Sequence, residues 1–86
     1  MKYLLKLLTE TRLKFTDAVW VDFQAEERHD GKVLNIKIYV KFLNSEGGLQ
    51  SAELEMTSER LDRMDDVIFG EICDQLWTEI ETERNG

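Results

Sequence analysis

Three segments in the middle of the chain alternate apolar and polar residues, a pattern typical of strands that bury one face. The clearest covers residues 32–42, and the others cover residues 18–27 and 49–57. Asp30-Gly31 and the NSEGG stretch at residues 44–48 predict the turns between them, because glycine accepts the positive φ of a tight turn. The segments therefore predict a three-stranded antiparallel meander. Its core-facing residues would be Val19, Val21, Phe23, Ala25, Leu34, Ile36, Ile38, Val40, Phe42, Ala52, Leu54 and Met56.

After residue 57 the apolar residues recur at intervals of three and four, which predicts one long helix over about residues 59–83. Thr57 or Ser58 is a suitable N-cap. Gly70 lies in the middle of this helix, where it costs about 1 kcal/mol relative to Ala, so it points to a bend or to close approach of another backbone. The apolar side is expected to pack on the sheet through Leu61, Met64, Ile68, Phe69, Ile72, Cys73, Leu76, Trp77 and Ile80.

The first twelve residues fit two structures. A strand that adds to the sheet is the preferred interpretation, because Leu13 and Phe15 continue an odd-numbered apolar register into the next segment. The alternative is a short amphipathic helix with Leu4, Leu5 and Leu8 on one side. The predicted fold is thus α+β, a single domain over residues 1–86. It has a three- or four-stranded antiparallel meander packed on one face by a long C-terminal α-helix.

With a helix at the N-terminus, the order of elements becomes helix, three strands, helix. This order resembles the topology of double-stranded-RNA-binding domains. That family places lysines at the start of its last helix to hold phosphates. The corresponding stretch here, Ser58 to Asp66, carries more carboxylates than basic side chains, so the resemblance is limited to topology and direct nucleic-acid binding is not expected.

The charge of the chain is concentrated in its last third. There are 18 Asp and Glu against 11 Lys and Arg, a net charge of −7. Residues 1–52 carry eight basic and seven acidic side chains, whereas residues 53–86 carry three and eleven. A surface of this sign repels nucleic acid and anionic lipid and attracts basic protein surfaces. We therefore expect a basic protein partner.

The carboxylates of the predicted C-terminal helix are the first candidate site. Between Arg63 and Arg84 the helix has no basic residue. The predicted function is a small acidic non-enzymatic binding protein that blocks a basic, nucleic-acid-binding type of site on its partner. Immunity proteins, antitoxins and phage-encoded inhibitors have these properties. The partner-binding residues would be Asp62, Asp66, Glu71, Asp74 and Glu81.

The polar face of the sheet is the second candidate. Trp20, Lys37, Tyr39 and Lys41 are predicted to lie there together, uncovered by the helix. An aromatic pair across two strands, an interface or a platform for single-stranded nucleic acid would each use such residues. The alternative function is therefore an assembly subunit, for example a homodimer, that associates through this face or an edge strand.

The sequence offers little for catalysis, metals or cofactors, and none is predicted. His29 beside Asp30 falls in a turn, and Cys73 has apolar and acidic neighbours that disfavour a thiolate. The nearby carboxylates lack the further loop oxygens that a calcium or magnesium site needs; they are Asp62, Asp65, Asp66 and Glu71. One cysteine excludes an internal disulfide, and no apolar run reaches 18 residues, so we expect a cytoplasmic protein without a membrane segment.

Overall fold

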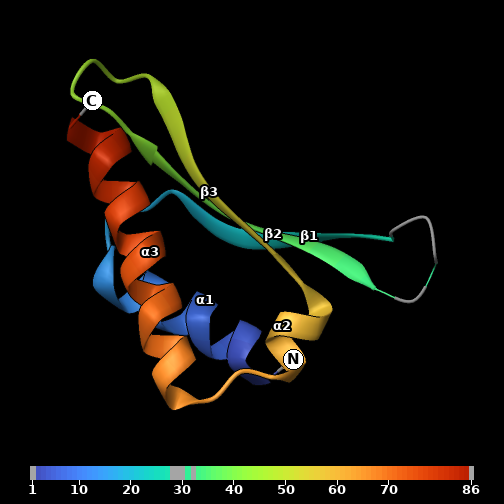
Figure 1. Ribbon diagram of the computed structural model, residues 1–86. Helices are drawn as coiled ribbons and strands as arrows, with labels where there is room; N and C mark the ends of the chain where they lie inside the picture. The colour runs from blue at the N-terminus through green and yellow to red at the C-terminus, as the bar shows by residue number, and fades with distance from the viewer. Residues whose placement is uncertain (1, 28–30, 32, 86) are drawn as a thin grey trace.

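The computed structural model describes residues 2–27, 31 and 33–85, and it has the predicted α+β class (Figure 1). A helix comes first, three strands follow, and two helices end the chain. In order, the elements are α1 (Lys2–Lys14), β1 (Trp20–Glu27), β2 (Leu34–Leu43), β3 (Leu49–Thr57), α2 (Ser58–Asp62) and α3 (Asp66–Asn85).

The three strands form one antiparallel sheet in the order β1-β2-β3, which confirms the predicted meander. On the central strand β2 the predicted inward residues Ile36, Ile38, Val40 and Phe42 are all buried. Between β2 and β3, the backbone N–H groups of Glu46 and Gly48 donate to the side-chain oxygen of Asn44, and Gly47 has φ +82°. This confirms the turn at residues 44–48. Of the other predicted turn, Gly31 has φ +67°, whereas His29 and Asp30 lie outside the described residues.

Both long helices lie on the same side of the sheet, α1 toward β1 and α3 along β3 (Figure 1). The core fills the space between these two layers. From α3 it takes Phe69, Ile72, Leu76 and Ile80, which are 8% exposed or less. No helix of the described residues covers the other side of the sheet.

The preference for an N-terminal strand is wrong, because residues 2–14 form α1. Leu4, Leu7, Leu8 and Thr11 recur at helical spacing and are buried against the sheet. Leu13, which carried the strand argument, is 69% exposed. The helix is favoured because it buries both Leu7 and Leu8, whereas a strand would bury only alternate residues.

The predicted long C-terminal helix is confirmed as α3, but its predicted extent over residues 59–83 is wrong, because the chain leaves the helical path at Met64 and Asp65. Thr57 caps α2, its side chain accepting a hydrogen bond from the N–H of Arg60. Asp65 caps α3, its carboxylate accepting from the N–H of Ile68 at 2.9 Å. Met64 between them is only 8% exposed, so the break places an apolar side chain in the core, where its burial is favourable.

Two residues predicted for the core are exposed, Val19 and Ala25. Ala25 lies in the exposed second half of β1 (Trp20–Glu27), and Val19 precedes the first residue of that strand. The ribbon of β1 and β2 extends past the helices at one end (Figure 1). The buried part of β1 is its start, where Val21 is 8% exposed. At this edge strand the Arg12 guanidinium donates to the carbonyl of Val21 at 2.8 Å, which satisfies an otherwise unpaired acceptor.

Candidate partner-binding surfaces

The outer face of α3 is produced by the same helical period that builds its core face. Because Phe69, Ile72, Leu76 and Ile80 turn toward the sheet, residues about half a turn away point to solvent. Three of the predicted site residues occupy this position and are exposed, namely Glu71, Asp74 and Glu81. We call these three the acidic face of α3.

The other two predicted residues are separated from the acidic face. Asp62 is exposed but is the last residue of α2, before the break in the helix. Asp66 begins α3 and accepts a hydrogen bond of 3.1 Å from the hydroxyl of Tyr3 in α1. The carboxylate of Asp66 therefore has a structural partner, and the acidic face is narrower than the sequence predicts.

Helix α1 brings basic side chains to the flank of α3. The Nζ atom of Lys6 lies 4.7 Å from the ring centroid of Phe69, and Lys14 and Glu81 line the same open groove. That groove has a volume of about 690 Å³ and is completed by Trp77, Thr78, Thr82 and Asn85. The sequence could not show this neighbourhood, because α1 and α3 are more than 50 residues apart along the chain.

No carboxylate of the acidic face makes an ion pair with a described residue. Within that part of the chain, the ion pair of α3 is Arg84 with Asp17, which joins the end of α3 to the loop after α1. Exposed carboxylates without a fixed cation keep their full electrostatic reach toward a partner.

The uncovered face of the sheet brings together the second predicted set. The indole N–H of Trp20 donates to the hydroxyl of Tyr39 at 3.3 Å, and Lys41 Nζ lies 5.7 Å from the Tyr39 ring centroid. Trp20 is 53% exposed. The predicted contact between the two aromatic residues is therefore present, and its use for binding stays a prediction.

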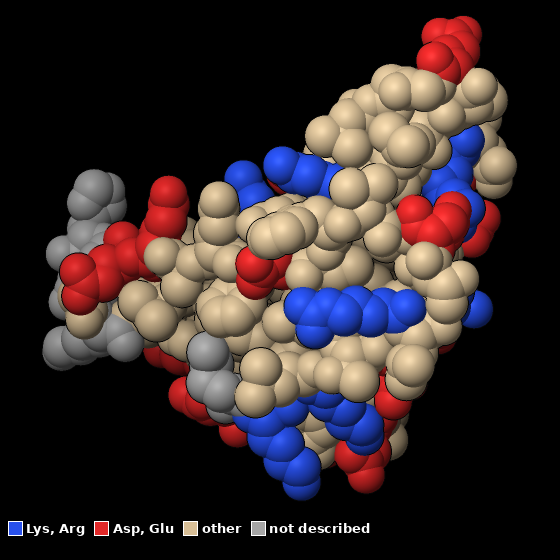
Figure 2. Space-filling view, turned by 180° about the vertical axis from the view of Figure 1, so that it is seen from behind, with Lys and Arg blue, Asp and Glu red and all other residues tan. Residues whose placement is uncertain are grey.

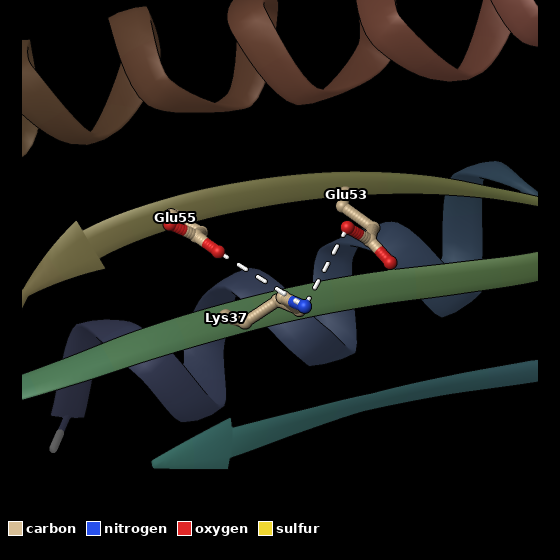
Figure 3. A network of polar contacts seen from close by, with 3 residues as sticks. All are labelled: Lys37, Glu53 and Glu55. Carbon is tan, nitrogen blue, oxygen red and sulfur yellow. Dashed lines mark ion pairs between the residues drawn. The ribbon is translucent and has the colours of Figure 1, made fainter. Parts of the chain in front are cut away.

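Lys37 differs from Lys41 in having acidic neighbours. Its Nζ atom lies 3.7 Å from a carboxylate oxygen of Glu53 and 4.0 Å from one of Glu55, both on β3 (Figure 3). These pairs neutralise Lys37 locally. Lys and Arg are also interspersed with Asp and Glu on the side opposite to the view of Figure 1 (Figure 2), so that side does not form a continuous basic surface.

Two leucines missed by the sequence analysis extend the uncovered face. Leu43 and Leu49 are paired across β2 and β3, and each is 59% exposed. Both occupy odd-numbered positions that the alternation of their strands assigns to the outer side. That parity was the signal that could have found them. With Trp20 they give this face three large exposed apolar side chains.

Comparison with protein-family models, with curated proteins and with solved structures found no match. The case for a function therefore depends on the surfaces and chemistry of the molecule itself.

The thiol of Cys73 lies in a position that disfavours its reactive form. Partial burial raises its pKa above 9.0, and Glu10 and Asp74 raise it further, while Lys6 acts in the opposite direction. A nucleophilic cysteine needs the lowered pKa that a nearby base or cation provides. Cys73 is thus placed as a packing residue between α1 and α3, and the other catalytic candidate, His29, lies outside the described residues.

Among the described residues, no three His, Cys, Asp or Glu side chains gather closely enough to hold a metal ion. In the same part of the chain, no helix has the length and apolar character needed to cross a membrane.

Proposed function

We propose that this protein is a small acidic binding protein without catalytic activity, which presents the acidic face of α3 to a basic site on a partner protein. The observation that carries the proposal is the exposure of Glu71, Asp74 and Glu81 on one helix face, without an ion-pair partner among the described residues. A rigid helix holds the three carboxylates at fixed spacing, so little order is lost on binding.

The distribution of charge supports this proposal. The net charge of −7 arises from residues 53–86, which include all of α2 and α3. Such a concentrated field accelerates encounter with a basic surface and repels nucleic acid. A protein that occupies a basic, nucleic-acid-binding type of site would block access to it, which is how inhibitors of the immunity, antitoxin or phage-encoded classes act.

The proposal is tested by capture of partners from a lysate of the source cells with three forms of the protein. The first is the native chain, and the second neutralises the acidic face by Glu71→Gln, Asp74→Asn and Glu81→Gln. The third is a matched control that removes the same charge elsewhere, by Glu26→Gln, Glu27→Gln and Glu46→Gln, all exposed positions outside the helices. A basic partner retained by the native chain and the control, and lost with the neutralised face, supports the proposal. Equal retention by all three forms contradicts it.

An assembly subunit is the second candidate, and the uncovered sheet face favours it. Trp20, Leu43 and Leu49 expose more than half of their surfaces there. Exposed apolar side chains that cluster on one face are typical of association surfaces. Trp20→Ser with Leu49→Ser would abolish association through this face and leave capture by the acidic face unchanged.

A further inference from the structure

The two long helices have opposite charge and lie side by side. Apart from Glu10, the charged residues of α1 are basic, namely Lys2, Lys6, Arg12 and Lys14. The charged residues of α3 are acidic apart from Arg84. The helix layer thus has a basic half and an acidic half. Arg12 turns to the Val21 carbonyl on β1, whereas Lys2, Lys6 and the acidic face of α3 are exposed.

The helices also run in the same direction. Tyr3, near the start of α1, contacts Asp66 and Phe69 at the start of α3. Phe15, directly after α1, packs edge-on against Trp77 with ring centroids 5.9 Å apart. The start of α1 therefore lies beside the start of α3, and the end of α1 lies beside Trp77.

From this arrangement we infer that two copies of the chain associate through their helix layers, with α1 of each copy on the acidic face of α3 of the other. A two-fold axis that runs along the helix layer produces this pairing. It places the basic half of one copy opposite the acidic half of the other and keeps the height of each residue along the axis. A two-fold interface uses one surface patch twice, so it requires a patch that is complementary to itself. The helix layer fulfils this condition through its two charges.

This symmetry identifies a specific contact. Lys6 lies at the level of Phe69, as its 4.7 Å distance to that ring shows. The axis therefore places Lys6 of one copy against Gly70 and Glu71 of the other. Gly70 leaves open space there, because a Cβ atom added to it would meet no atom within 4 Å. Leu13 and Val67, which are 69% and 72% exposed, add apolar surface to the two halves.

This inference rests on the proposed function, because it assigns a second copy to the surface that a basic partner would use. It adds a form of regulation. Self-association covers the acidic face at high protein concentration, and a basic partner must displace α1 of the second copy in order to bind. Binding to the partner and dimer formation then exclude each other.

Sedimentation velocity over a wide range of protein concentrations, at low and at high ionic strength, tests the inference. It is applied to the native chain, to two charge variants and to the sheet variant Trp20→Ser with Leu49→Ser. Lys6→Glu places two carboxylates opposite each other at both contacts of the dimer, and Glu71→Lys places two ammonium groups there. Each variant alone should raise the dissociation constant of the dimer about tenfold, since two pairs are reversed at once. An equimolar mixture of the variants restores opposite charges at both contacts, so it should form mixed dimers near the native affinity.

A native dimer that weakens with salt, is weakened about tenfold in each charge variant and regains its affinity in the mixture supports the inference. A native chain that stays monomeric at low salt and high concentration overturns it. The inference is also overturned if both charge variants still form the dimer while Trp20→Ser with Leu49→Ser abolishes it. That result would place the association on the uncovered sheet face. If the chain is monomeric while capture of a basic partner still depends on Glu71, Asp74 and Glu81, self-association fails and the proposed function stands.

Discussion

The hydroxyl of Tyr3 donates a hydrogen bond of 3.1 Å to the carboxylate of Asp66, and this contact joins the first turn of α1 to the first turn of α3. The Tyr3 ring also packs on Phe69, with centroids 5.6 Å apart. Desolvation of the hydroxyl, followed by the hydrogen bond to Asp66 and its negative charge, raises the pKa of Tyr3 above 10.0. These contacts hold the start of the basic helix α1 against the start of the acidic helix α3.

The contact makes stability depend on pH in a specific direction. Because the fold favours the neutral hydroxyl, its contribution is complete below the unfolded pKa of 10.0 and is lost as the pH rises through the higher folded pKa. Tyr3→Phe should lower the melting temperature at neutral pH, and the difference from the native chain should shrink at pH values above 10.0. Thermal unfolding followed by circular dichroism at several pH values measures it. A difference that is constant over this range would contradict the assignment.

The break between α2 and α3 depends on the cap that Asp65 supplies. Its carboxylate accepts from the N–H of Ile68 at 2.9 Å, so Asp65→Ala leaves that donor without its partner. The expected loss is about 1 kcal/mol of unfolding free energy. Asp65→Asn retains a side-chain acceptor and should lose much less. Urea unfolding of both variants provides the comparison, and equal losses would show that charge rather than capping is responsible.

The two glycines Gly70 and Gly47 should respond to alanine in opposite directions. Gly70 lies within α3 with open space at its Cβ position, so Gly70→Ala should stabilise the chain by about 0.5–1 kcal/mol. Gly47 has φ +82°, a conformation that a Cβ atom strains, so Gly47→Ala should destabilise it. Both are measured by denaturant unfolding at high dilution, where self-association does not contribute. A destabilising Gly70→Ala would mean that this position needs glycine even in the monomer.

The two sides of α3 should differ strongly in their sensitivity to truncation. Leu76 is fully buried between α3 and the sheet, so Leu76→Ala should cost about 2–5 kcal/mol. Val67 is 72% exposed, and Val67→Ala should change stability by less than about 0.5 kcal/mol. Chemical denaturation with the two variants side by side checks this, and a large cost at Val67 would indicate that its face is covered.

The sequence predicted those parts of the fold in which local pattern and tertiary packing agree. The alternation of β2 and the turn at residues 44–48 both predict the observed meander, because the inward-facing residues and the turn glycines specify the same pairing of β2 with β3. Residues 2–14 satisfied strand and helix patterns together, and only packing against the sheet decides between them. The break at Met64 and Asp65 was hidden because the apolar spacing from Leu61 onward continues through it.

The candidate sites were predictable as far as they depend on single elements. Exposure of Glu71, Asp74 and Glu81 follows from the period of α3, and the proximity of Trp20 and Tyr39 follows from the pairing of β1 with β2. The role of Asp66 was not predictable, since its partner is Tyr3, 63 residues away. For the same reason, the basic flank that α1 supplies could only be recognised in the folded chain.

The central claim, that the acidic face of α3 binds a basic partner, is tested most directly by association kinetics. Association with the captured and purified partner is measured by stopped flow at increasing ionic strength. The native chain and the control with Glu26, Glu27 and Glu46 neutralised should bind quickly at low salt and slow steeply as salt screens the charges. The chain with Glu71, Asp74 and Glu81 neutralised should bind slowly at low salt and depend little on it. An association rate of the native chain that stays constant from low to high ionic strength, in a complex that remains tight, would contradict the claim.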